Sequence, residues 1–213
     1  MTYFPEYALY IKSLIGVLAI VNPMGAIPIF LTLCAGRTII ECKKVARTSA
    51  VSVALILIIA TWAGDGILAF FGIGIPAFRT GGGLLILLMA IAMMHAKQSH
   101  SQHTPAEADE ASGKECIAVV PLAIPLMAGP GAISLVIVNA HQADNWNERF
   151  ILTIGIILVA LLVWLVLRLA TPIGKKLGLT GLNIATRIMG LLLAAIGIQM
   201  MATGLVKLLP GLG

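Results

Sequence analysis

Six long apolar segments constrain this chain more than any other feature of its sequence. They cover approximately residues 7–33, 45–71, 78–95, 116–139, 150–170 and 183–205. A helix needs about 20 apolar residues to cross the hydrocarbon core of a bilayer, and each segment is close to that length. Because the segments are continuously apolar and do not alternate with polar residues, they predict spanning helices and not the strands of a membrane barrel.

The composition agrees with a membrane protein and excludes several soluble classes. Hydrophobic residues make up 59% of the 213 residues and charged residues 11%, whereas soluble domains carry about 25% charged residues. A soluble enzyme, a disordered protein and a nucleic-acid binder are therefore excluded, since the net charge of +5 comes from scattered basic residues. Cys34, Cys42 and Cys116 lack the spacing of a zinc site or a disulfide framework, so we expect no metal and no cofactor.

The distribution of lysine and arginine predicts the orientation of the chain in the bilayer. Ten of the fourteen fall in the connections after the first, third and fifth segments, and these connections are expected to be cytoplasmic. Both termini are then on the outer side. The polar linker 96–115 is expected to be a solvated cytoplasmic loop, and its histidines to be surface residues. The four basic residues left for the outer side are Lys12, Arg79, Arg149 and Lys207.

The chain also repeats itself weakly, which divides it into residues 1–95 and 116–213. Each half holds three predicted helices, and because three is odd the halves must insert in opposite orientations. Such inverted repeats are typical of alternating-access transporters; chance similarity between glycine-rich apolar helices is the alternative. The matches pair residues 25–28 with 131–134, residues 71–73 with 177–179, and Arg79 and Gly82 with Arg187 and Gly190.

Proline and glycine interrupt the first helix of each half near its middle. Proline removes a backbone donor, and unwound backbone at membrane depth is tolerated only inside protein or beside a wet cavity. Exposed N–H groups would attract a carboxylate and exposed carbonyls an ammonium group, so two breaks without charged residues suit a zwitterion. Simple proline kinks are the alternative. The candidate substrate-binding residues are Asn22, Pro23, Gly25 and Pro28 in the first break, and Gly129, Pro130, Gly131 and Ser134 in the second.

Three charged residues near the ends of the segments are candidates for coupling or gating. Asp65 lies a few residues before the outer end of the second segment, where a carboxylate is costly. Arg79 opens the next segment on the same side as a potential partner, and Arg187 is its counterpart in the second half. An interfacial cap or ion pair is the alternative role for Asp65. Gly81, Gly82, Gly83 and Gly190 are expected to permit close helix packing.

Four motifs resemble those of the MarC family of inner-membrane proteins. They are NPMGAIPIF (22–30), FRTGGGLLILLMAIAMM (78–94), VPLAIPLMAGPGAIS (120–134) and RIMGLLLAAIGIQMM (187–201). The resemblance covers nearly the whole chain; Thr80 stands where isoleucine is common. It implies a multi-pass protein of the bacterial inner membrane with six helices. Together with the orientation predicted from lysine and arginine, this makes both termini periplasmic. Some members are described as transporters of small neutral amino acids such as glycine and alanine, so it also implies that substrate class.

The resulting expectation is a secondary transporter of small neutral amino acids that works by alternating access. A passive channel or a regulatory membrane subunit is the alternative. An enzyme is not expected, because no intramembrane histidine faces the serines of the spans, and no GxxxxGK[ST] loop is present to couple transport to ATP. Protons acting through Asp65 are our first hypothesis for the coupling ion, with sodium at the carbonyls of the breaks as the alternative. A homo-oligomer remains open.

Overall fold

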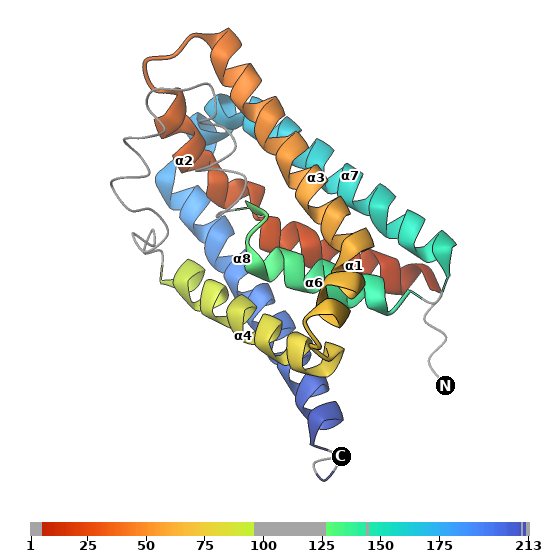
Figure 1. The fold of residues 1–213 in the computed structure, drawn as a ribbon. Coiled ribbons are helices and arrows are strands. Elements are labelled where there is room, and N and C mark those ends of the chain that lie inside the picture. The colour runs from red at the N-terminus through yellow and green to blue at the C-terminus, as the bar shows by residue number, and fades with distance from the viewer. Residues whose placement is uncertain (1–5, 96–126, 144, 210, 212–213) are drawn as a thin grey trace.

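Helices provide all the regular structure in the part of the chain that the computed structural model describes, residues 6–95, 127–143, 145–209 and 211 (Figure 1). No strand occurs in those ranges, which confirms the all-helical prediction for them. The helices are α1 (Glu6–Val21), α2 (Pro23–Cys34), α3 (Ile39–Phe70), α4 (Ile75–Met94), α6 (Pro130–His141), α7 (Trp146–Arg168) and α8 (Ala170–Leu208).

Within the described ranges, five stretches are long and apolar enough to cross a membrane. They are Ser13–Cys34, which joins most of α1 to α2, and the helices α3, α4, α7 and α8. The apolar helix α6 is shorter, with 12 residues. The predicted linker 96–115 and the start of the predicted fourth segment lie outside the described residues. The protein is therefore an integral membrane protein with five candidate spans, and the six-helix arrangement in two repeats stays a prediction.

Two helices extend beyond the predicted segments. Helix α3 begins six residues early because Thr38 and Glu41 form a capping box: the Glu41 N–H donates to Thr38 Oγ1 over 3.3 Å, and the Thr38 N–H to Glu41 Oε2 over 2.7 Å. Its 32 residues give a length of about 48 Å, more than the roughly 30 Å of a bilayer core. Helix α8 begins at Ala170, where we expected residue 183, and kinks at Gly178.

Gly72 and Gly178 both have a positive φ angle. Their φ angles are +66° and +61°, values that favour glycine because it lacks a Cβ atom. The sequence repeat pairs these same two residues. Gly72 lies in the turn between α3 and α4, and Gly178 at the kink within α8. A positive φ at these two positions does not test the repeat, because Gly36 also has one.

Helices α4 and α8 form the most extensive helix pair, and glycine lets their backbones approach closely. A Cβ atom placed on Gly83 would lie 2.6 Å from the carbonyl oxygen of Gly197, and one on Gly190 would lie 3.1 Å from that of Ala90. The rising numbers on α8 meet falling numbers on α4, so the helices are antiparallel. The predicted packing role is confirmed for Gly82, Gly83 and Gly190. It is wrong for Gly81, because a Cβ atom there would meet no atom of the described residues within 4 Å and this side of α4 faces away from the neighbouring helices.

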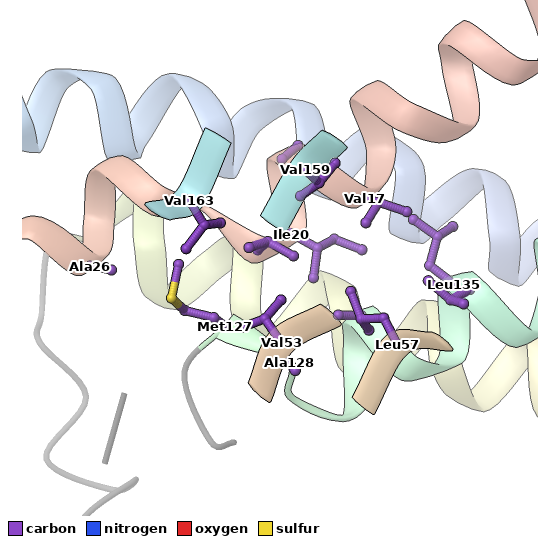
Figure 2. Close-up of a cluster of buried hydrophobic side chains, with 14 of the residues drawn as sticks. Val17, Ile20, Ala26, Val53, Leu57, Met127, Ala128, Leu135, Val159 and Val163 are labelled. Carbon is purple, nitrogen blue, oxygen red and sulfur yellow. The ribbon is translucent and has the colours of Figure 1, made fainter. Parts of the chain in front are cut away.

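The apolar core lies where α1, α3, α6 and α7 meet. Figure 2 shows Ile20 of α1 and Val53 of α3 in one cluster with Leu135 of α6 and Val163 of α7. Many large apolar side chains face outward instead, as expected for helices that contact lipid chains. Examples that are about half exposed or more are Leu55, Ile59, Ile154, Leu158 and Leu161.

Candidate functional site

The first helix breaks at Asn22, as predicted, but over a shorter stretch than expected. Asn22 adopts the left-handed conformation, with φ 43° and ψ 65°, and its Oδ1 accepts the Gly25 N–H over 3.2 Å. Pro23 occupies the first position of α2 and has no N–H, so the carbonyl of Ala19 loses its helical donor. Pro28 does not extend the break, because α2 continues through it to Cys34.

The second break precedes α6 and leaves the start of that helix without a side-chain cap. Gly129 is the N-cap residue, in an extended conformation, and Pro130 takes the first helical position. The N–H groups of the first helical turn have no partner within the helix, and glycine offers no side chain to satisfy them. Gly129 is buried whereas Pro130 is exposed. The donors without a partner inside the helix include the N–H groups of Gly131 and Ala132, which are both buried residues.

The two breaks lie at the same level because α1 runs antiparallel to α6. Asn139 Nδ2 donates to Ser13 Oγ over 2.6 Å, and a Cβ atom on Gly16 would lie 3.2 Å from Leu135 Cδ2. Continuing this register brings the end of α1 beside the start of α6. Met127 and Ala128 accordingly lie in the same buried cluster as Ile20 (Figure 2). The unwound backbone is thus enclosed by protein and shielded from lipid.

The remaining predicted residues of the second break face α4. A Cβ atom placed on Gly131 would lie 3.0 Å from Met89 Sδ, and one on Gly82 would lie 2.6 Å from Ser134 Cβ. Ser134 is only 4% exposed. Gly131 and Ser134 therefore belong to the α4–α6 interface, whereas Asn22, Pro23 and Gly25 form the turn between α1 and α2.

Asp65 pairs with residues that the sequence did not single out as partners. Its Oδ2 accepts a hydrogen bond from Arg149 Nη2, and its Oδ1 lies 3.1 Å from His141 Nδ1. The suggested pairing with Arg79 is wrong in this structure, because α6 packs against both α3 and α4 and presents His141 to Asp65. A signal for Arg149 existed: it is one of only four basic residues predicted on the same side as Asp65.

Four polar contacts between the two predicted halves gather at one end of the bundle. We call it the Asp65 end; it holds the turn between α3 and α4 and the turn between α6 and α7 (Figure 1). Two of the contacts are those of Asp65. The third joins Trp62 Nε1 to Thr153 Oγ1 over 3.1 Å, and the fourth is the bond from Asn139 to Ser13. These contacts fasten α1 and α3 to α6 and α7.

The two arginines that the repeat pairs have different surroundings. Arg79 is only 9% exposed, and its buried Nε has no hydrogen-bond partner among the described residues. Arg187 on α8 is exposed. Sequence reasoning missed this burial, although Gly82 three residues later gave a signal: residues three apart on a helix share a face, and glycine marks a face packed against another helix.

One apolar cavity of about 180 Å³ lies between α1, α6 and α7, away from both breaks. Its polar lining residues, Ser13 and Asn139, already bond to each other. Its other lining residues include Ile11, Ile154 and Leu158, which are about half exposed on the lipid-facing surface. In the described ranges no three histidine, cysteine, aspartate or glutamate side chains cluster as metal ligands would.

Comparison with known proteins places the chain in a family. A family model described as "MarC family integral membrane protein" matches residues 7–209. The UPF0056 membrane protein YhcE of Escherichia coli (strain K12) is 42% identical over 209 residues, which cover 98% of this chain and 97% of the relative. The UPF0056 membrane protein YvbG of Bacillus subtilis (strain 168) is 36% identical over 205 residues, covering 96% and 97%. No solved structure matches. The chain belongs to the MarC family of integral membrane proteins.

Proposed function

We propose that this protein is a secondary carrier for small neutral amino acids that works by alternating access. The observation that carries the proposal is the pair of helix breaks that lie at one level inside the protein. Transporter sites are commonly built from discontinuous helices whose ends face the substrate near the middle of the bilayer. The family resemblance supports glycine and alanine as the substrate class.

The chemistry of the two breaks supports a zwitterion. The carbonyl end of α1 at Ala19 carries partial negative charge and suits an ammonium group, whereas the N–H groups of Gly131 and Ala132 suit a carboxylate. Asn22 Nδ2 offers one further donor beside the first break. The surrounding apolar side chains, such as Ile20 and Met127, are at most 1% exposed, which favours a substrate with a small side chain.

The polar contacts at the Asp65 end support a gate between the halves. Asp65 is about 29% exposed and holds two partners on the opposite half, so its protonation would release both. In the proposed cycle these contacts close the predicted periplasmic side, and their separation opens it. Proton coupling through Asp65 follows from that arrangement, and sodium at the carbonyls of the breaks is the competing hypothesis.

Counterflow in proteoliposomes tests the proposal. Liposomes holding purified protein are loaded with unlabelled alanine, and entry of labelled alanine or glycine is followed over time. A carrier gives transient accumulation above equilibrium, whereas a passive channel gives equilibration without an overshoot. Loss of exchange is expected in Asn22→Gly. Asn145→Gly is the matched control, because Asn145 is an exposed N-cap residue without a side-chain cap bond.

The outcomes separate the candidate functions. An overshoot that Asn22→Gly loses and Asn145→Gly keeps supports a carrier whose site includes the first break. Exchange that is unchanged in Asn22→Gly would remove that residue from the site. If labelled glycine and alanine enter no faster than into protein-free liposomes, the amino acid substrate is wrong, and a regulatory subunit becomes the better hypothesis.

A further inference from the structure

Arg79 is a buried cation in a membrane-spanning helix without a counter-ion in the described ranges. It is only 9% exposed, and its Nε is buried without an acceptor. The carboxylate of Asp65 is already held by Arg149 and His141. No other described carboxylate forms an ion pair with Arg79. Ionisable groups at such positions are costly and usually mark a pathway for ions or substrate.

Arg79 lies one helical turn before the point at which α4 packs against α6. Arg79 and Gly82 lie three residues apart and so share a face of the helix. A Cβ atom on Gly82 would lie 3.0 Å from Ser134 Oγ, and it would lie closer still to Ser134 Cβ. Ser134 is 4% exposed, and no hydrogen bond joins its hydroxyl to another described residue. Arg79, whose buried Nε lacks an acceptor, and the buried Ser134 therefore lie about one helical turn apart along this part of α4.

We propose that Arg79 binds the carboxylate of the transported amino acid, with the Ser134 hydroxyl as a second donor. This inference rests on the proposed function and names the group that recognises one end of the substrate. An arginine guanidinium matches a carboxylate with two parallel hydrogen bonds, and a serine hydroxyl can donate a third. The absence of a Cβ atom at Gly82 is what allows Ser134 to approach α4 at this level.

The position of this pair fits a route from the Asp65 end to the breaks. Gly131, in the first turn of α6, packs against Met89 further along α4. The α4–α6 interface therefore runs from Ser134 to the second break, and Arg79 lies one helical turn before it. A carboxylate held at Arg79 lies on that path, and the N–H groups of the break lie beyond it. A phosphate oxygen of a lipid headgroup offers the same anionic chemistry, so the experiment must distinguish the two sources.

The test compares the wild-type protein with Arg79→Gln, Arg79→Lys and Lys207→Gln. Lys207 is an exposed cation near the end of α8 and serves as the control. Counterflow measures the half-saturating concentration of alanine, and alaninamide, which lacks a carboxylate, is the competitor. Losing a hydrogen bond to a charged group should raise the half-saturating concentration about tenfold to a hundredfold in Arg79→Gln. Arg79→Lys should lose less, and Lys207→Gln should match the wild type.

The competitor gives a readout that a purely structural role would not change. In the wild type alaninamide should compete far more weakly than alanine, and in Arg79→Gln most of this difference should disappear. Wild-type affinity in Arg79→Gln, or equal competition in the wild type, would overturn this assignment and leave the carrier intact. A wild type that exchanges no amino acid would overturn both the assignment and the proposed function.

Melting temperatures measured with alanine or with lipid show which of the two binds at Arg79. They also identify a variant that fails to transport only because it is unstable. Alanine should stabilise delipidated wild type and Arg79→Lys, but not Arg79→Gln. If phosphatidylglycerol raises the melting temperature through Arg79 and alanine does not, the ligand is a headgroup and the substrate assignment is wrong. Ser134→Ala leaves the cation in place and should raise the half-saturating concentration of alanine by a smaller factor.

Discussion

Replacing Asn22 by alanine and by glycine separates the backbone role of this residue from its side-chain role. The residue adopts a left-handed conformation, and its Oδ1 caps α2 by accepting the Gly25 N–H. Alanine removes the cap and resists the left-handed conformation. Glycine removes the same side chain but adopts that conformation freely. Both variants lose any hydrogen bond from the Asn22 amide to a substrate.

The two substitutions should differ clearly in stability. A lost N-cap costs about 1 kcal/mol when alanine replaces asparagine and only a few tenths when glycine does. The left-handed conformation costs an alanine roughly 1 kcal/mol more. Asn22→Ala should therefore lose about 2 kcal/mol and Asn22→Gly less than about 0.5 kcal/mol. For a chain of this size the melting temperature should fall by about 4–8 °C in the first and about 1–2 °C in the second.

The loss of alanine transport in the two variants should not follow the order of their melting temperatures. If the amide of Asn22 contacts the substrate, both variants should lose alanine counterflow to a similar extent despite their different melting temperatures. Measuring both quantities on the same purified samples provides the check. Counterflow that is retained in Asn22→Gly and lost only in Asn22→Ala would show that the conformation of the break matters and the amide does not, which would refute the binding role.

Three further substitutions, one of them with a matched control, probe the proposed gate at Asp65, the contact between α4 and α8, and the kink at Gly178. Asp65→Asn weakens the ion pair with its partners, so alanine uptake should stop responding to an imposed proton gradient; a normal response would leave Asp65 as an interfacial ion pair. Gly83→Ala places a methyl group 2.6 Å from the Gly197 carbonyl oxygen and should cost about 1–3 kcal/mol, whereas Gly81→Ala, which meets open space, should leave the melting temperature unchanged. Gly178→Ala must adopt φ 61° with ψ 179°, a region that is essentially restricted to glycine, and should cost about 1–3 kcal/mol; an unchanged melting temperature would show that the kink can relax.

The sequence was sufficient for features that depend on local chemistry. The lengths of the apolar segments predicted the spanning helices, because a helix in any membrane fold needs about 20 apolar residues to cross the bilayer. The Asn22-Pro23 pair predicted a break, because a proline without an N–H must interrupt the helix somewhere nearby. Sequence could not decide between Asn22 and Pro28 as the point of the break. In the structure the break lies at Asn22, which adopts the left-handed conformation and caps α2 by accepting the Gly25 N–H. Pro28 lies in the interior of α2 without breaking it.

Features that depend on which helices pack against each other could not be predicted from the sequence. Asp65 and Arg79 lie close in the chain and on the same predicted side, so pairing them was reasonable. The insertion of α6 between α3 and α4 gives Asp65 to His141 and Arg149 and leaves Arg79 near α6. Nothing local distinguishes Arg79 from Arg187 either, and only tertiary packing buries the first and exposes the second.

The arrangement of the breaks explains why a charge outside them would matter for binding. The end of α1 carries partial negative charge and the start of α6 partial positive charge, each of about half an elementary charge. Lying at the same level, these ends largely offset each other, so the empty site needs no charged side chain to be stable. Each end attracts the opposite charge of a zwitterion, but only with a partial charge. A strong preference for a carboxylate therefore requires an uncompensated cation close to the path, and among the described residues of α4, Arg79 meets that requirement. Burying Arg79 without an ion pair among the described residues would be costly in the proposed carrier before substrate binds, and a bound carboxylate would remove that cost.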